Sequence, residues 1–133
     1  MNKLVLYALG AFAMLVGTGS SCERKPCPEN TICTEVFSLV TIQVTDKNGQ
    51  PVTLTEAFTE KPATEEIIRL AQNMQDGRYV VLDDSYRKNI ENTADSFRFV
   101  GTLNGQPVVS EMFIIGADCC HIQKHHGREE VTL

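Results

Sequence analysis

Four of the five cysteines stand near the two ends of the chain, and this placement constrains the fold more than any other feature. Cys27 and Cys33 come early, and the adjacent pair Cys119 and Cys120 comes late. A bond between adjacent cysteines would hold two Cα atoms about 3.8 Å apart, below the usual disulfide range of about 4.4–6.8 Å. We therefore expect two bridges between the ends, either 27–119 with 33–120 or 27–120 with 33–119. Each bridge would close a loop of roughly 90 residues, worth about 4–5 kcal/mol less any strain.

The start of the chain indicates the compartment in which such bridges would form. Lys3 precedes an uninterrupted apolar run of 14 residues, Leu4–Gly17, and small residues then lead to Cys22. This order predicts a secretory signal over residues 1–21. The apolar run is shorter than the roughly 20 residues that a membrane span needs.

The residues around Cys22 resemble a bacterial lipobox, in which the cysteine is diacylated and becomes the mature N-terminus. Ser20 and Ser21 match the small-residue positions, whereas Gly19 stands where Leu or Val is common. Boxes that end in Ser-Ser-Cys resemble those of small lipoproteins from Bacteroidota-type bacteria. Lipidation of Cys22 would leave an even set of four cysteines, which in an oxidising compartment indicates disulfides. The alternative is an ordinary cleaved signal that leaves Cys22 as a plain thiol.

The chain after the predicted signal is acidic. Lys3 is the only charged side chain of residues 1–21, so the remaining 112 residues carry 11 basic and 17 acidic side chains, a formal net charge of −6. This balance argues against binding to nucleic acid and against direct adhesion to anionic lipid headgroups. We expect lipid chains to attach the protein to the outer membrane of the bacterial cell envelope. The sequence does not decide between the periplasmic and the surface face of this membrane. Residues 22–34 are polar and predict a tether, and residues 35–133 predict one domain.

The domain begins with the pattern of a β protein. Within Val36–Thr45, the apolar residues Val40, Ile42 and Val44 alternate with polar ones, as in a half-buried strand. A second β-rich run over Val52–Phe58 reads as the return strand.

The pentapeptide Asn-Gly-Gln-Pro-Val occurs twice, at Asn48–Val52 and Asn104–Val108. Asn-Gly suits the φ > 0 geometry of a tight turn, so each copy predicts a hairpin between the β-rich runs that flank it. The proline after each turn has no N–H to donate, so it is expected at the start of a strand or on an edge. In the strand before the second copy, Phe97, Phe99 and Leu103 share a face, and we expect Phe97, Phe99 and Phe113 in the core.

The middle of the chain is mixed. Thr64–Gly77 has helix-like apolar spacing and predicts a short helix, with a strand over Glu66–Leu70 as the alternative. Arg78–Leu82 predicts a strand, and Asp83–Asn92 predicts a helical turn capped by its first residues, Asp83, Asp84 or Ser85. Glu129–Leu133 predicts a terminal strand. The chain is therefore expected to be mainly β, an antiparallel β-sandwich of about six or seven strands with one or two short helices.

Part of this pattern resembles a known group of modules. A strand, then Asp-x-Asn-Gly-x-Pro-Val, then a strand is similar to the opening hairpin of transthyretin-like, carboxypeptidase-regulatory-like and bacterial Ig-like modules, and Gly77–Asp84 is similar to a later strand of them. The matching residues of the hairpin are Asp46, Asn48, Gly49, Pro51 and Val52. The resemblance covers about half of the mature chain and implies a secreted β-sandwich used for adhesion, display or ligand binding, with no catalytic residues.

The C-terminal stretch offers a metal site as an alternative to disulfides. Five soft or borderline donors lie within eight residues, and they suit zinc or copper: Cys119, Cys120, His121, His125 and His126. His121 and His125 would align on a helix. Against this, Phe113–Ile122 reads as the end of a strand, where adjacent cysteines point to opposite faces, and Gln123–Gly127 is typical of a solvated turn. A redox role is not favoured, because no C-x-x-C spacing is present.

The remaining motifs leave the function open. Asp46, Asp83, Asp84 and Asp118 would suit calcium if they met at one end of the sandwich, although capping explains the first three. No nucleophile elbow or triad pattern is evident, and a hydrolase would require a deep polar cleft around His121. We therefore expect a lipid-anchored, non-catalytic envelope protein without a cofactor that binds a protein or glycan partner, or supports one. The alternative is a metal-binding lipoprotein that uses the cysteine and histidine cluster.

Overall fold

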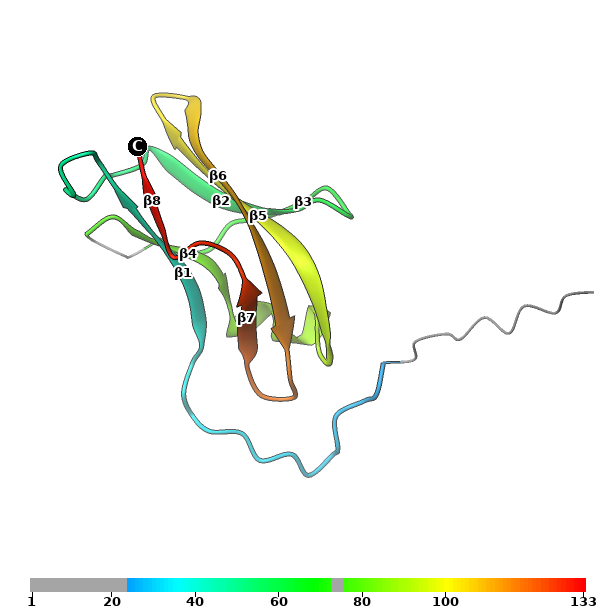
Figure 1. Ribbon diagram of the computed structural model, residues 1–133. Helices are drawn as coiled ribbons and strands as arrows, with labels where there is room; N and C mark the ends of the chain where they lie inside the picture. Colours follow the sequence, from blue (N-terminus) through cyan, green and yellow to red (C-terminus); the bar gives the residue numbers. More distant parts are fainter. Residues whose placement is uncertain (1–23, 73–75) are drawn as a thin grey trace, which may run out of the picture.

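The computed structural model describes residues 24–72 and 76–133, and these residues form two facing β-sheets (Figure 1). The predicted signal over residues 1–21 and the predicted lipidation site Cys22 lie outside the described residues. The described part contains eight strands and one 3₁₀-helix, as follows: β1 Leu39–Thr45, β2 Glu56–Lys61, β3 Glu66–Ile68, β4 Arg78–Asp83, η1 Asp84–Asn89, β5 Thr93–Leu103, β6 Gln106–Ala117, β7 Ile122–His126 and β8 Glu130–Thr132. The expectation of a mainly β sandwich with little helix is confirmed.

The smaller sheet has the order β4-β1-β8, with β1 in the middle. Strand β4 pairs with β1 antiparallel, and the short β8 pairs with it in parallel from Gln43 to Thr45. Val40, Ile42 and Val44 of β1 are buried, which confirms the alternation seen in the sequence. The strand begins at Leu39, three residues later than expected from the run of β-branched residues.

The larger sheet has the order β3-β2-β5-β6-β7 and is built around a long hairpin. Strands β5 and β6 pair from Thr93 opposite Ala117 to Leu103 opposite Gln106. Asn104 and Gly105 form the two-residue turn and both have positive φ, 52° and 78°, as a type I′ turn requires. The second predicted hairpin is therefore confirmed.

The first predicted hairpin is wrong, although its turn forms. Asp46 and Gln50 close the turn with a backbone hydrogen bond of 2.8 Å, but only an isolated bridge, Thr45 opposite Pro51, follows it. The chain then crosses to the other sheet as β2, because at the turn end of β1 one edge is taken by the β4 side and the other by β8. The Tyr79 hydroxyl serves this crossing segment by donating to the Val52 carbonyl at 2.8 Å and accepting from the Leu54 N–H at 2.7 Å.

Aromatic side chains of the hairpin fill the space between the sheets. Phe97, Phe99 and Phe113 are fully buried, as expected from their shared face. Tyr86 of η1 meets Phe97 edge to face at 5.6 Å between ring centroids, so the 3₁₀-helix closes one end of the core. Asp83 caps η1 by accepting the Ser85 N–H, which confirms the predicted capped turn.

No helix is present over Thr64–Gln72, the described start of the helix expected over Thr64–Gly77, and the alternative strand is present as β3. Residues 73–75 of this prediction lie outside the described residues. The Thr59 and Ile68 positions face each other across β2 and β3, and Ile68 is buried whereas Ile67 is exposed. This two-residue period suits a β-branched pair on a sheet edge better than a helix. Within the described residues, no helix has the length and apolar character needed to cross a membrane.

Two glycines with positive φ offer a test of the packing beside β1. A Cβ on Gly77 (φ +71°) would lie 2.5 Å from the Val44 carbonyl oxygen, whereas a Cβ on Gly105 (φ +78°) would meet nothing within 4 Å. Both Gly→Ala changes strain the backbone, but only Gly77→Ala adds a clash with main chain. We expect Gly105→Ala to cost about 1 kcal/mol of unfolding free energy and Gly77→Ala about 3 kcal/mol, measured by urea unfolding. Equal losses in the two variants would contradict the close approach of Gly77 to β1.

Candidate functional site

Two disulfides fasten the N-terminal arm, which we define as residues 24–38, to the loop between β6 and β7. Cys27 is bonded to Cys119 and Cys33 to Cys120, with Cα–Cα distances of 5.5 and 5.3 Å. Both distances lie in the ordinary disulfide range. Of the two connectivities that the sequence left open, the structure has 27–119 with 33–120. The arm consequently runs along the lower end of the sandwich in Figure 1.

Asp118 shapes the loop that presents the two cysteines. Its carboxylate accepts the N–H groups of Cys120 and His121 at 2.6 and 2.8 Å, and these hydrogen bonds lower the pKa of Asp118. Strand β6 ends at Ala117, so the adjacent cysteines lie in this loop and not, as expected, at the end of a strand. As loop residues they reach two different cysteines of the arm.

Asp84 and His121 form a second connection between the arm and the domain. The Asp84 carboxylate is almost fully buried and accepts the Ser38 N–H at 2.7 Å, the Ile122 N–H at 2.8 Å and the His121 Nδ1 hydrogen at 2.8 Å. Burial opposes ionisation of Asp84, but the hydrogen bonds from His121, Ser38 and Ile122 outweigh it and lower the pKa of this carboxyl. The other ring nitrogen of His121, Nε2, lies 2.9 Å from the Thr34 hydroxyl.

The order Thr34, His121, Asp84 matches the order of hydroxyl, base and orienting carboxylate in a hydrolytic triad. Catalysis by such a triad also needs a site that binds the substrate and hydrogen-bond donors that stabilise the oxyanion. Thr34 is exposed on the arm, and of three surface hollows in the described part of the chain, none is lined by Thr34 or His121. The deep polar cleft that a hydrolase would require around His121 is therefore not among these three hollows. In the structure, the three groups connect the arm to η1 and to the β6–β7 loop.

The 3₁₀-helix and the turn after it contact both the arm and the β6–β7 loop. Arg87 Nη1 donates to the Cys119 carbonyl of the loop, and Asn92 Nδ2 donates to the Lys25 carbonyl of the arm at 2.6 Å. Arg24 Nη1 reaches the Asn89 carbonyl at 3.4 Å. Local sequence patterns could not predict these contacts, because the residues that meet are more than 30 positions apart.

The five donors of the predicted metal cluster do not come together. Cys119 and Cys120 are oxidised, and both ring nitrogens of His121 have partners. The turn expected over Gln123–Gly127 is wrong, because residues 122–126 form β7 against β6. His125 and His126 are both exposed and lie at a register shift between β6 and β7, and His125 lies over Gly116, where an added Cβ would come to 2.6 Å from its Nε2.

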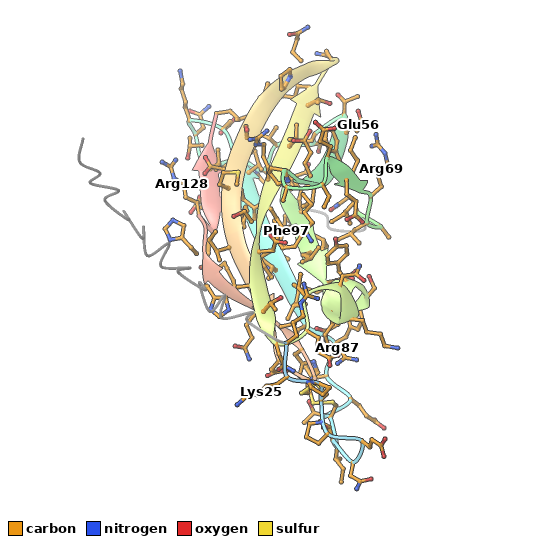
Figure 2. All side chains as sticks on the ribbon, turned by 90° about the vertical axis from the view of Figure 1, so that its right-hand side faces the viewer. Lys25, Glu56, Arg69, Arg87, Phe97 and Arg128 are labelled. Atoms are coloured by element: carbon orange, nitrogen blue, oxygen red, sulfur yellow. A yellow bond between two sulfur atoms is a disulfide. The ribbon has the colours of Figure 1, made fainter. Side chains whose placement is uncertain are left out.

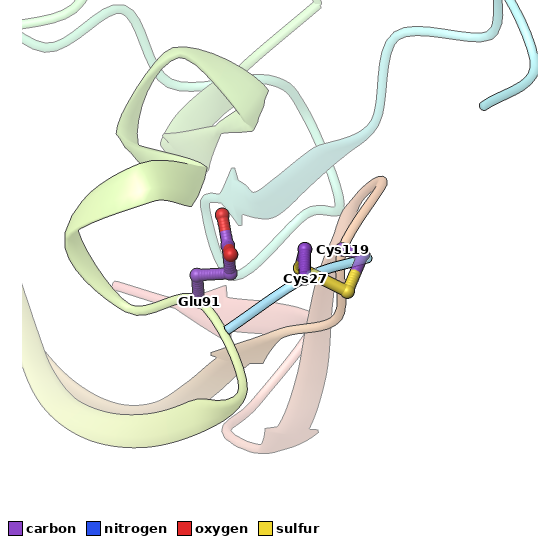
Figure 3. A group of neighbouring side chains, drawn as sticks. All are labelled: Cys27, Glu91 and Cys119. Atoms are coloured by element: carbon purple, nitrogen blue, oxygen red, sulfur yellow. A yellow bond between two sulfur atoms is a disulfide. The ribbon is translucent and has the colours of Figure 1, made fainter. Parts of the chain in front are cut away.

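A different group, Cys27, Glu91 and Cys119, brings three donor atoms within 4.8 Å of one another, and it is the only such trio of Cys, His, Asp or Glu in residues 24–72 and 76–133 (Figure 3). Both of its sulfurs belong to one disulfide. Because metals bind thiolates, the oxidised group offers a single carboxylate.

The four aspartates considered for calcium all accept backbone N–H groups. Asp46 accepts the N–H groups of Asn48 and Gln50 within its own turn, and Asp83 accepts that of Ser85. Asp46 follows the last residue of β1, whereas Asp84 bonds to Ser38 just before the first residue, so the two lie at opposite ends of this strand.

No protein-family model, curated protein or solved structure matches the chain. The similarity to transthyretin-like and Ig-like modules stays an expectation from the sequence, and the two-sheet architecture stands on the structure alone.

Removal of both bridges should cost more stability than the sum of the two single removals. One bridge alone closes a loop of roughly 90 residues, worth about 4.5 kcal/mol, and the second then closes only a ring of nine residues, Cys27–Cys33 with Cys119 and Cys120, worth about 2.5 kcal/mol. We expect Cys33→Ser with Cys120→Ser to cost about 2.5 kcal/mol of unfolding free energy, Cys27→Ser with Cys119→Ser a similar amount, and all four changes together about 7 kcal/mol. Urea unfolding under non-reducing conditions measures each. A loss of only about 2.5 kcal/mol for the quadruple variant would contradict this ring.

The lowered pKa values of Asp84 and Asp118 predict a loss of stability in acid. A carboxyl whose folded pKa lies below its unfolded value stabilises the fold above that value, and the contribution disappears as the pH falls through the folded pKa. We expect the unfolding free energy to fall below about pH 3.8, the ordinary value for both groups. Asp84→Asn should lower stability at pH 7 and flatten this acid dependence, as measured by urea unfolding at successive pH values. Asp46→Asn, the same substitution in a turn away from the arm, is the matched control.

Proposed function

We propose that this chain is a lipid-anchored, non-catalytic β-sandwich of the bacterial cell envelope that is held close to its anchor and binds or supports a partner there. The observation that carries the proposal is the pair of disulfides that joins the segment just after Cys22 to the β6–β7 loop. Disulfides that close long loops are typical of exported proteins, which agrees with the predicted signal over residues 1–21.

The position of the first bridge limits how far the domain can stand from a lipid on Cys22. Cys27 stands five positions after Cys22, and a fully extended chain over five positions spans at most about 17 Å. The end of the sandwich that carries the bridges would therefore lie close to the membrane surface.

The opposite end of the sandwich would then face away from the membrane. Strand β6 runs from the Asn104–Gly105 turn at one end to the cross-linked loop at the other, a distance of roughly 35 Å for its 12 residues. A free polar tether would let the domain turn in all directions, whereas an arm that is bonded from Arg24 to Ser38 restricts its orientation. The arm would therefore limit both the distance and the orientation of the domain relative to its anchor.

Lipidation is tested by changing Cys22 in the full chain, expressed in a bacterium that processes lipoproteins. We expect the parent chain to carry the mass of an acylated cysteine and to remain in the membrane fraction until detergent is added. Cys22→Ala should lose that mass and leave the membrane fraction, and its two disulfides should form as in the parent. Membrane retention of Cys22→Ala, or an unmodified Cys22 thiol in the parent chain, would contradict the proposal.

A thiol titration combined with elemental analysis distinguishes the proposed non-catalytic binding role from the metal-binding alternative. We expect no reactive thiol at Cys27, Cys33, Cys119 or Cys120 in the folded chain and no stoichiometric zinc or copper. Free thiols at Cys119 and Cys120, together with metal retained through purification, would favour the alternative instead.

A further inference from the structure

A groove of about 660 Å³ runs along the side of the sandwich between β1 and β7. Its apolar lining comes from Val36 and Phe37 of the arm, Leu39 of β1 and Ile122 of β7. Val36, Phe37 and Leu39 are 67%, 60% and 43% exposed, which makes this groove a concentration of exposed apolar surface on the molecule. In Figure 1 the arm leads directly into β1 on the side where β7 stands.

Half of β1 has an open edge on this groove. On one side β1 pairs with β4 along Leu39–Gln43, but on the other side β8 pairs with it only from Gln43 onward. Among the described residues, no strand lies against Leu39–Ile42 on that second side. The smaller sheet therefore ends in a short stretch of uncovered strand.

The hydrogen-bond pattern shows which backbone groups point into the groove. The Ser38 carbonyl and the Val44 N–H bond toward β4, and the Gln43 N–H bonds toward β8 at Glu129. Because successive strand residues alternate, Leu39 and Thr41 direct their N–H and C=O groups to the uncovered side. No backbone partner for these groups is found in the described part of the chain.

Strand β7 contributes a second open edge. The His121 carbonyl accepts the Asp118 N–H on the side of β6, so Ile122 and Lys124 point the other way. The Ile122 N–H is taken by Asp84 at 2.8 Å, which leaves the backbone of Lys124 facing the groove. Two strand edges, one from each sheet, thus border the same hollow.

The charges around the groove cancel. Two basic residues, Arg78 and Lys124, and two acidic residues, Glu129 and Glu130, line it, and Lys124 is paired with Glu129. A balanced lining gives no attraction for a phosphate, a cationic peptide or another strongly charged group. What it offers instead is unpaired backbone N–H and C=O groups beside apolar side chains.

We propose that the groove binds an extended, uncharged segment of a protein partner by β-strand addition to the Leu39–Ile42 edge of β1. The backbone of the segment would pair with Leu39 and Thr41, and apolar side chains at alternate positions would contact Val36, Phe37 and Ile122. The site accommodates about four paired residues, because β8 occupies the edge from Gln43 onward. This inference deepens the binding role proposed above by naming the partner class, and it does not depend on the lipid.

Position 41 allows the edge to be blocked without breaking the sheet. The Thr41 N–H faces the groove and not β4, so Thr41→Pro removes one donor from the edge and leaves the ladder with β4 in place. Thr41→Val keeps the N–H and is the matched control. The probe is an acetylated, amidated peptide of alternating valine and threonine, with a second version that is N-methylated on alternate residues and so cannot donate on one edge.

Backbone NMR of the full chain, purified as the cell processes it, reads out binding. We expect the alternating peptide to shift the amide signals of Leu39, Thr41 and Lys124 and to slow hydrogen exchange at Leu39 and Thr41. The affinity should fall about tenfold or more for Thr41→Pro and for the N-methylated peptide, and stay within about twofold for Thr41→Val.

Three results would overturn the proposal. Slow exchange of the Leu39 and Thr41 amides in the free protein would mean that the edge is already paired. Absence of peptide-induced shifts at these residues would mean that the edge does not accept a strand. Equal affinity of the N-methylated and parent peptides would mean that side chains alone are recognised, as for a small apolar ligand. None of these results would bear on acylation of Cys22, so the two proposals fail separately.

Discussion

The rest of the structure at this end of the molecule depends on the covalent attachment of the arm to the β6–β7 loop. Ile32, Val36 and Phe37 of the arm are exposed, so burial of apolar surface cannot hold the arm in place. The two bonds to Cys119 and Cys120 do so, and they bring polar partners within reach. Once the arm is held, Asp84, His121, Asn92 and Arg87 complete a network that joins the arm, the loop and η1. Figure 2 shows the arm with Lys25 below the sandwich and Arg87 close above it.

The cross-links also shape the groove. Cys33 is fixed to the loop after β6, and Val36 and Phe37 follow within four residues, so the bridge sets where these two side chains lie. The same end carries the point at which a lipid would attach, five residues before Cys27. An anchored chain would therefore present the open edge of β1 near the membrane, where an extended segment of a neighbouring envelope protein can reach it. Strand addition to β1 does not require the lipid anchor, and an anchor on Cys22 would leave the edge of β1 accessible.

Local sequence patterns predicted several of the strands. The alternation in β1, the run that became β4 and the Asn104–Gly105 hairpin all depend on short-range chemistry, and each is present. The identical pentapeptide at Asn48 failed as a hairpin signal, because the turn chemistry is local whereas the choice of strand partner is not. The helix expected over Thr64–Gly77 failed for a related reason. Edge pairing with β2 buries Ile68, and the periodicity of a short apolar run does not reveal such a partner.

By itself, the sequence determined that this chain is a β protein and favoured disulfides between its two ends over a vicinal pair, because alternation and Cα spacing are properties of neighbouring residues. It also predicted export of the chain and lipidation of Cys22. Only the tertiary structure decided which cysteine meets which, that His121 bridges Asp84 and Thr34, and that β8 stops short and leaves half of β1 uncovered. Those outcomes depend on contacts between residues more than 30 positions apart. A local sequence pattern does not determine which of several distant groups will make such a contact.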